Sequence, residues 1–223
     1  MAPRRIVFVD FDGTACADDT GHLVAERYRN PVWDEFESRW ERREISTRVR
    51  AEGQYSSAAV TPEGVDEALR TARLAPGFRR FRRFVAEAGG DLRLVSDGFD
   101  VLIHKVLERE ALADLAFESN VLRMADGRLL PEFPFEDQGC GHCGLCKGAA
   151  LRRVRAHYDQ IVFVGNGLSD SCAAPQADLV FAKGSFAKYC RDRGIAHRPF
   201  EGFAEITAAL EAEWGVSLRR GTA

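Results

Sequence analysis

Four short apolar runs divide the chain, and each has the composition of a strand buried inside a sheet. The runs are Ile6–Val9, Leu92–Val95, Ile161–Val164 and Leu179–Phe181. Continuous rather than alternating apolar character is typical of parallel strands that are covered on both faces. Three of the runs lead directly into polar, glycine-containing turns. Because the carboxyl ends of parallel strands meet at one edge of a sheet, we expect these turns to form one shared site.

A helical pattern fills the interval between the first two runs. Pro31 and Pro62 can each start a helix, and Pro76-Gly77 precedes a third. Aromatic residues recur at helical spacing after the first and third of these starts, which is most simply explained by core packing. The insert directly follows the first strand, so it can close over the site as a lid.

The second half of the chain carries two further signals. Asp126-Gly127 lies between two apolar segments and predicts a β-hairpin. The stretch from 133 to 146 has the composition of a loop, and Lys147 then starts a helix that we expect to reach Tyr158.

Charge and composition narrow the function classes. The net charge of −3 argues against a nucleic-acid partner. The sequence has no apolar run long enough for a membrane span, so we expect no membrane partner either. We expect a cytoplasmic protein, either monomeric or homodimeric.

Two carboxylates one residue apart follow the first strand. Asp10 and Asp12 stand in the segment IVFVDFDGT. Like charges repel when they are held together, and burial increases that cost. A chance strand-to-turn junction could produce the pattern, but a site that needs a cation or two acids explains it better.

Four segments together resemble the motifs of the haloacid dehalogenase (HAD) superfamily, and they occur in the same order. The segment DFDGT at 10–14 is similar to the nucleophile motif, and Ser96 is similar to the strand-end residue that binds phosphate. Lys147 and the segment GNGLSD at 165–170 are similar to the third and fourth motifs. The resemblance covers nearly the whole chain. It implies a phosphoric monoester hydrolase whose partner is a small phosphorylated metabolite.

The same resemblance implies a fold class and a division into domains. It implies an α/β fold in which a three-layer, Rossmann-like parallel sheet forms the HAD core and a helical cap is inserted. The core would comprise residues 1–14 and 90–223. The cap, of the C1 type, would comprise residues 15–89.

The resemblance also implies a role for each matched residue. Asp10 would attack phosphorus to form an aspartyl-phosphate, and Asp12 would protonate the leaving group and then deprotonate water. Lys147 would neutralise charge on both Asp10 and the phosphate. The implied phosphate-binding residues are Thr14, Ser96, Asp97, Gly98 and Lys147. The implied magnesium ligands are Asp10, Asp12, Asn166 and Asp170. For Asp97, capping of the following helix is an alternative role, and we favour it.

Asn166 departs from the superfamily pattern, which usually has aspartate at this position. An amide oxygen can still coordinate Mg²⁺, but it brings no formal charge to the site. We therefore expect weaker magnesium binding unless Asp170 compensates.

Smaller features indicate a substrate class. Ser-Asp-Gly at 96–98 and the Cys-Lys pair before the third-motif helix resemble phosphatases of methionine salvage, which act on 2-hydroxy-3-keto-5-methylthiopentenyl-1-phosphate. Phosphocholine/phosphoethanolamine phosphatases are similar in the same stretches, and phosphoserine phosphatase is a more distant relative. A phosphotransferase and a non-catalytic phosphate-ligand sensor remain alternative hypotheses.

Six cysteines occur, and three have a metal-ligand spacing. Cys140, Cys143 and Cys146 form CxxCxxC. They could hold a structural zinc ion with His142 or a distant residue as fourth ligand. A loop of small residues with free thiols explains the spacing too, and we favour it. Cys172 and Cys190 stand among apolar residues and are interpreted as packing residues.

Overall fold

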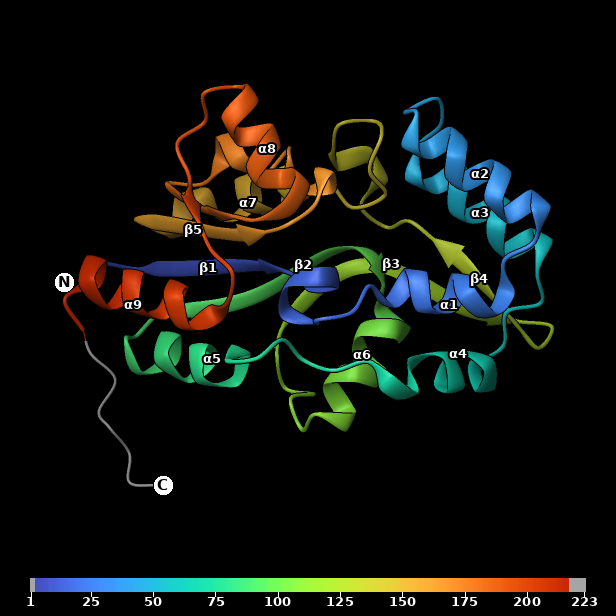
Figure 1. Cartoon of the computed structure of the whole chain (residues 1–223), viewed down its shortest axis with the longest axis horizontal. Coiled ribbons are helices and arrows are strands. Elements are labelled where there is room, and N and C mark those ends of the chain that lie inside the picture. Colours follow the sequence, from blue (N-terminus) through green and yellow to red (C-terminus); the bar gives the residue numbers. More distant parts are fainter. Residues whose placement is uncertain (1–2, 217–223) are drawn as a thin grey trace.

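The computed structural model describes residues 3–216. Within that range a seven-stranded sheet has the order β4-β3-β2-β1-β5-β6-β7 (Figure 1). The strands are β1 (Arg5–Asp10), β2 (Asp91–Phe99), β3 (Phe117–Ala125), β4 (Arg128–Glu132), β5 (Gln160–Gly165), β6 (Leu179–Ala182) and β7 (Arg198–Pro199). The four apolar runs of the sequence form β1, β2, β5 and β6, which pair in parallel as predicted.

Helices cover both faces of the sheet and complete three layers. The helices are α1 (Thr20–Tyr28), α2 (Pro31–Glu41), α3 (Thr47–Ser57), α4 (Pro62–Ala68), α5 (Phe78–Glu87), α6 (Asp100–Arg109), α7 (Lys147–Val154), α8 (Gly184–Asp192) and α9 (Phe203–Trp214). α5, α6 and α9 lie on one face, and α7 and α8 lie on the other (Figure 1). None of the helices in the described part is long and apolar enough to cross a membrane.

Side chains of β1 alternate between two apolar cores, one on each face. Val7 and Val9 pack with α5, α6 and α9, whereas Ile6 and Phe8 pack with α7 and α8. All four side chains are at most 1% exposed. Full burial of a side chain of this size stabilises the fold by about 1.5–3 kcal/mol. The continuous apolar run at the start of the chain therefore fixes the central strand and the position of its carboxyl end.

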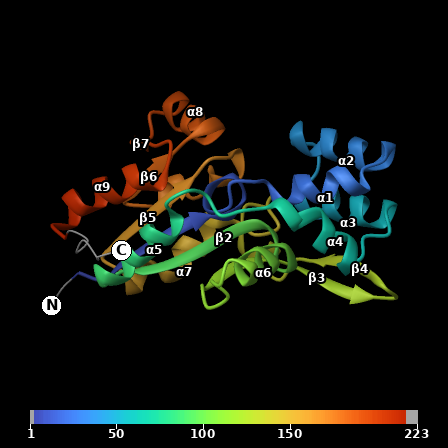
Figure 2. The same ribbon diagram turned by 60° about the horizontal axis from the view of Figure 1, so that its bottom comes forward.

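The inserted helices occupy two places. α1 to α4 gather beside the sheet, next to the β3–β4 hairpin (Figure 2). The backbone N–H of Leu129 in β4 donates to the carbonyl of Val60 at 2.8 Å, which ties the hairpin to this group. α5 instead packs against α9, where the rings of Phe84 and Trp214 stack at 5.6 Å. We propose that the cap comprises α1 to α4 and that α5 belongs to the core.

Local signals set most element ends. Asn30 and Thr61 cap α2 and α4 through their side chains, and a proline follows each cap as expected. Asp126 and Gly127 have positive φ angles of 49° and 75°, which suits the tight turn of the predicted hairpin. α7 ends at Val154, and a 3-10 helix of Arg155–His157 continues it until the chain becomes extended at Tyr158, the predicted end.

Candidate active site

The turn after β1 brings the first and fourth motifs into contact. Gly13 has a φ of 69°, in the left-handed region that favours glycine. A methyl group on Gly13 would lie 2.3 Å from Nδ2 of Asn166, so no larger residue fits without displacing that side chain. The two loops are therefore packed against each other at the carboxyl edge of the sheet.

Lys147 lies between two buried carboxylates. Its Nζ donates to Asp10 at 2.6 Å and to Asp170 at 2.5 Å, and the side chain is only 1% exposed. Burial lowers the pKa of Lys147, but the two carboxylates outweigh this effect and hold the pKa above its ordinary value. Lys147 is therefore a fixed positive charge at the site.

The two carboxylates are themselves held by backbone amides. Asp10 Oδ1 accepts from the N–H of Phe11 at 2.8 Å. Asp170 Oδ2 accepts from the N–H groups of Asn166 and Gly167 at 2.8 and 3.0 Å. Burial and the neighbouring charge of Asp170 raise the pKa of Asp10, and the ammonium group of Lys147 offsets part of this rise.

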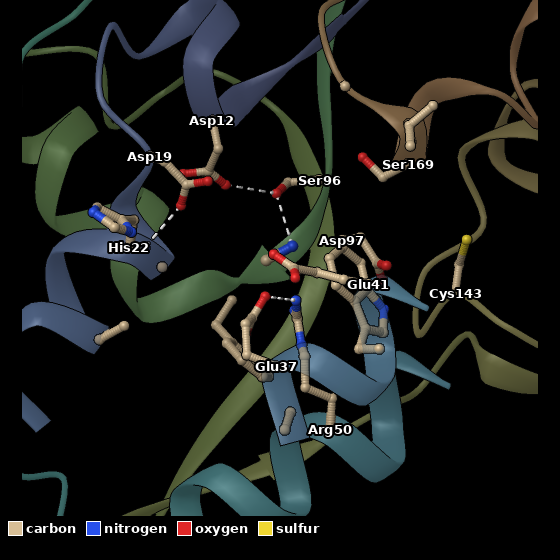
Figure 3. A pocket seen from close by; sticks show the side chains of 18 of the residues that line it. Asp12, Asp19, His22, Glu37, Glu41, Arg50, Ser96, Asp97, Cys143 and Ser169 are labelled. Carbon is tan, nitrogen blue, oxygen red and sulfur yellow. Dashed lines mark hydrogen bonds and ion pairs between the residues drawn. The ribbon is translucent and has the colours of Figure 1, made fainter. Parts of the chain in front are cut away.

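Asp12 has the properties of a proton donor and acceptor near neutral pH. Its carboxylate accepts from the N–H and the hydroxyl of Thr20 at 2.8 and 2.6 Å, and from Ser96 Oγ at 3.3 Å (Figure 3). Burial and then the charge of Asp19 raise the pKa of Asp12 from 3.8 to about 6. A carboxyl group with this pKa can exchange a proton with a reacting group during turnover.

These residues meet in one cavity of about 680 Å³. Its core side includes Asp10, Asp12, Ser96, Lys147 and Asn166. Four distant segments of the sequence contribute this set, and the predicted convergence at the sheet edge is present in the fold.

Thr14 and Asp170 lie behind the cavity wall. Both are fully buried, and neither lines the cavity. The Thr14 hydroxyl donates to Asn166 Oδ1 at 3.1 Å, and both carboxylate oxygens of Asp170 are engaged. Direct contact of Thr14 with phosphate and of Asp170 with metal therefore stays a prediction from the sequence. We propose that Thr14 positions Asn166 and that Asp170 positions Lys147.

Asp97 does not cap a helix, so that prediction is wrong. α6 begins at Asp100 without a side-chain cap from the preceding residues. Asp97 lines the cavity and accepts hydrogen bonds from the Thr47 hydroxyl at 2.8 Å, the Leu145 N–H at 2.8 Å and Asn120 Nδ2 at 3.1 Å. It therefore joins α3, β3 and the cysteine-containing loop beneath the cavity.

Sequence reasoning missed the aromatic residues of the cap that line the cavity. Trp33 packs in the apolar core as expected, and it also lines this space together with Trp40 and Tyr55. The Arg50 guanidinium lies 4.0 Å from the centre of the Trp40 ring and forms an ion pair with Glu37 at 3.3 Å (Figure 3). The cap thus presents aromatic faces and several charges of each sign to a bound molecule.

Comparisons with known proteins agree with this geometry. Residues 5–190 match a family model described as "Putative Phosphatase". The chain belongs to this family. It is a phosphatase of the HAD superfamily, and the predicted fold class and enzyme class are confirmed.

Individual relatives extend over nearly the whole chain. The chain is 29% identical over 221 residues to a 2-hydroxy-3-keto-5-methylthiopentenyl-1-phosphate phosphatase of Geobacillus thermodenitrificans, covering 95% of this chain and 97% of that protein. It is 26% identical to the bifunctional enzyme MtnB/MtnX of Bacillus licheniformis, covering 93% of this chain and 49% of that protein. A phosphoserine phosphatase structure, a phospho-aspartyl intermediate analogue, is similar in fold, with a TM-score of 0.70, 17% identity and coverage of 93% and 99%.

Proposed function

We propose that the protein hydrolyses the phosphate monoester of a small metabolite through an aspartyl-phosphate on Asp10. The observation that carries the proposal is the contact of Asp10 with Lys147 at the floor of the cavity. The lysine offsets the repulsion between a carboxylate nucleophile and a phosphate dianion.

Two proton transfers by Asp12 would complete the reaction. A carboxylate oxygen of Asp10 attacks phosphorus, the bond from phosphorus to the ester oxygen breaks, and Asp12 gives its proton to the leaving oxygen. Asp12 then takes a proton from water, which attacks the phosphorus of the aspartyl-phosphate and releases inorganic phosphate with Asp10 restored. Ser96 and the N–H of Gly98, which donates to Ser96 Oγ at 2.9 Å, lie where the phosphate oxygens would be held.

The cavity offers oxygen ligands of the kind that Mg²⁺ prefers. We propose that the Asp10 carboxylate, the Asp12 carbonyl and the Asn166 amide oxygen would hold the ion. Asn166 fits this role because it lies against Gly13, in the turn that carries Asp10 and Asp12, and because it lines the cavity. A bound magnesium ion would supply positive charge that lowers the repulsion felt by the substrate dianion.

Asn166→Asp is expected to tighten magnesium binding at least about tenfold, because it adds a formal negative charge beside the ion. The measurement is the Mg²⁺ concentration at half-maximal phosphate release. Gln138→Glu, which adds one charge on the exposed loop, serves as the control. An unchanged magnesium requirement in Asn166→Asp would contradict the assignment of this ligand.

Asp12→Asn should lower activity by about 10²–10⁴-fold and, in EDTA, raise the melting temperature at pH 8. Because folding raises the pKa of Asp12 from 3.8 to about 6, its contribution to stability is full below pH 4 and lost as the pH rises through 6. Asparagine has no charge to bury, so the variant avoids the cost of the ionised Asp12. The melting temperatures of the two proteins should therefore differ at pH 8 and become similar below pH 4. Melting curves between pH 4 and 8 measure this, and equal melting temperatures at pH 8 would refute the raised pKa.

The substrate class that we propose is a phosphorylated methylthio sugar derivative, as named for the Geobacillus relative. The rings of Trp33, Tyr55 and Phe99 line the cavity and would contact an apolar methylthio group. A phosphate-release screen should include this enol phosphate, phosphoserine, phosphocholine and phosphoethanolamine. We expect kcat/KM to be at least about tenfold higher for the enol phosphate. Preferred hydrolysis of another compound would reject this substrate but leave the phosphatase reaction intact.

Phosphoserine is a second candidate because of the Glu37–Arg50 pair. An acid and a base on the cavity wall could contact the ammonium and carboxylate groups of an amino acid. If phosphoserine is the substrate, Glu37→Gln should raise KM for phosphoserine with a smaller effect on kcat. Adding glycerol to the same assay distinguishes hydrolysis from transfer, since a phosphotransferase would form glycerol phosphate.

A further inference from the structure

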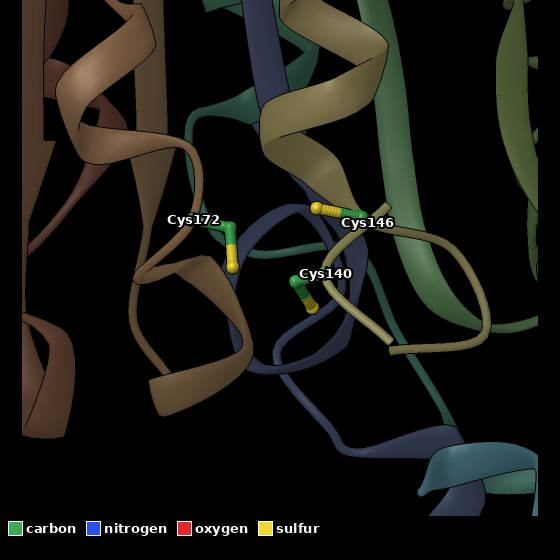
Figure 4. Close-up of side chains that lie close together, drawn as sticks. All are labelled: Cys140, Cys146 and Cys172. Carbon is green, nitrogen blue, oxygen red and sulfur yellow. The ribbon is translucent and has the colours of Figure 1, made fainter. Parts of the chain in front are cut away.

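Four of the six cysteines gather beside the active site. The Sγ atoms of Cys140, Cys146 and Cys172 lie within 4.8 Å of one another (Figure 4). The Sγ atom of Cys143 is 3.5 Å from that of Cys140. Cys172 comes from the segment that follows the fourth motif, so the cluster joins two parts of the chain that are distant in sequence.

The sulfur separations suit a shared metal ion. Four thiolates bound tetrahedrally to zinc at about 2.3 Å lie about 3.8 Å from one another. The distances among Cys140, Cys146 and Cys172, which reach 4.8 Å, and the Cys140–Cys143 distance of 3.5 Å lie on either side of this value. Cys143 is outside the group of three that share the 4.8 Å limit, so its sulfur would have to move toward the others as the ion binds. A disulfide requires about 2.0 Å between two sulfur atoms and would leave the other two thiols without a partner.

His142 is the ligand that the sequence offers as an alternative, and the structure places it elsewhere. Its ring stacks on Trp40 with the centres 6.3 Å apart, and it lines the cavity. Burial, followed by the positive charge of Arg43, lowers the pKa of His142. The fourth sulfur of the cluster removes the need for a histidine ligand.

We propose that Cys140, Cys143, Cys146 and Cys172 bind one structural zinc ion, separate from the phosphate-binding centre. Each thiol gives its proton to solvent as its bond to zinc forms, so the site takes up Zn²⁺ and releases four protons. Cys140 is exposed and gives the ion a route of entry, whereas Cys143 and Cys146 are 7% and 3% exposed.

The position of the site explains what the ion would do. Cys146 immediately precedes Lys147, and Cys172 follows Asp170 by two residues. The two segments already touch, because a methyl group on Gly148 would lie 2.1 Å from the carbonyl oxygen of Cys172. A zinc ion would lock this contact and so hold the lysine against its carboxylate partner.

The ion would also stabilise a loop on which the cap rests. The carbonyl of His142 accepts from the N–H of Thr47 in α3 at 2.8 Å, and the N–H of Leu145 donates to Asp97. His142 and Leu145 both stand between cysteines of the cluster. Zinc binding therefore connects the docking of the cap with the geometry of the third motif.

Metal content is the test, and it does not depend on the proposed reaction. The full chain is produced in zinc-supplemented medium, purified without chelators or a metal-affinity tag, and measured by inductively coupled plasma mass spectrometry. We expect about one zinc ion per chain. Protein with less than about 0.2 zinc per chain would overturn the proposal, and so would a Cys140–Cys143 disulfide found by mass spectrometry.

Variants separate the ligands from the other cysteines. Cys172→Ala and Cys140→Ser should reduce zinc content at least about fivefold, and both should lower the melting temperature. Cys140 is exposed, so its variant remains informative if Cys172→Ala does not fold. Cys190→Ala, a buried cysteine of α8 outside the cluster, should keep the full zinc content. Equal zinc content in Cys172→Ala and Cys190→Ala would overturn the assignment of Cys172.

Cobalt provides a second measurement. Protein refolded with Co²⁺ alone should show the visible absorption of a tetrahedral thiolate site, and Cys140→Ser should lose most of it. A spectrum of octahedral cobalt bound to oxygen ligands would exclude the four-cysteine site.

Discussion

Asp10→Asn is expected to reduce phosphate release by at least about 10⁴-fold while the protein stays folded. The amide is a very weak nucleophile, so the phosphorus–oxygen bond of the intermediate cannot form at a useful rate. Asparagine keeps an oxygen that can accept the hydrogen bonds from Lys147 and from the N–H of Phe11, which preserves the local geometry. Steady-state phosphate release with saturating Mg²⁺ measures the effect.

Two controls make this result specific to the proposed nucleophile. Asp159→Asn makes the same chemical change at an exposed residue that accepts a hydrogen bond from the N–H of Arg4. It should keep full activity. Borohydride trapping during turnover should convert Asp10 of the unaltered enzyme to homoserine, detectable by mass spectrometry. Homoserine at position 12 instead would identify Asp12 as the nucleophile and contradict the assignment of Asp10.

The central sheet could be predicted because its signal is local. Each of β1, β2, β5 and β6 is buried on both faces, and this leaves an uninterrupted apolar run in the sequence. The polar turns at their ends then had to share one edge, which predicted the convergence of Asp10, Ser96 and Asn166. Lys147 starts a helix and not a strand-end turn, so it was expected at the site only from the resemblance to the superfamily. Residue type and strand direction were sufficient for the three strand-end residues.

The direction of each side chain could not be predicted, since it depends on partners distant in sequence. Thr14 and Asp170 match the motifs by type, yet both point into the packed layer behind the cavity. Asp97 precedes a helix and looks like a cap, but its three partners come from α3, β3 and the cysteine-containing loop. Cys172 looks like a small packing residue until the fold places it beside Cys146.

Lys147→Met is expected to lower the free energy of unfolding by about 3–5 kcal/mol at pH 8, together with a loss of activity. The substitution fills similar space but leaves the buried carboxylates of Asp10 and Asp170 without their shared cation. Two adjacent carboxylates then raise each other's pKa, so the destabilisation should shrink as the pH falls and they become protonated. Urea unfolding in EDTA at pH 8 and at pH 5 measures the loss of unfolding free energy at each pH.

Lys188→Met gives the matched control for this loss, because it removes the same charge from an exposed pair with Asp192. Water screens that pair, and its removal should change the free energy of unfolding by less than about 1 kcal/mol at either pH. The difference between the two variants therefore isolates the effect of burial from that of losing a lysine. If Lys147→Met unfolds at the same urea concentration as Lys188→Met, the cation is not what allows two acids to lie together beneath the cavity. The burial of the Asp10 carboxylate beside that of Asp170 would then need another explanation.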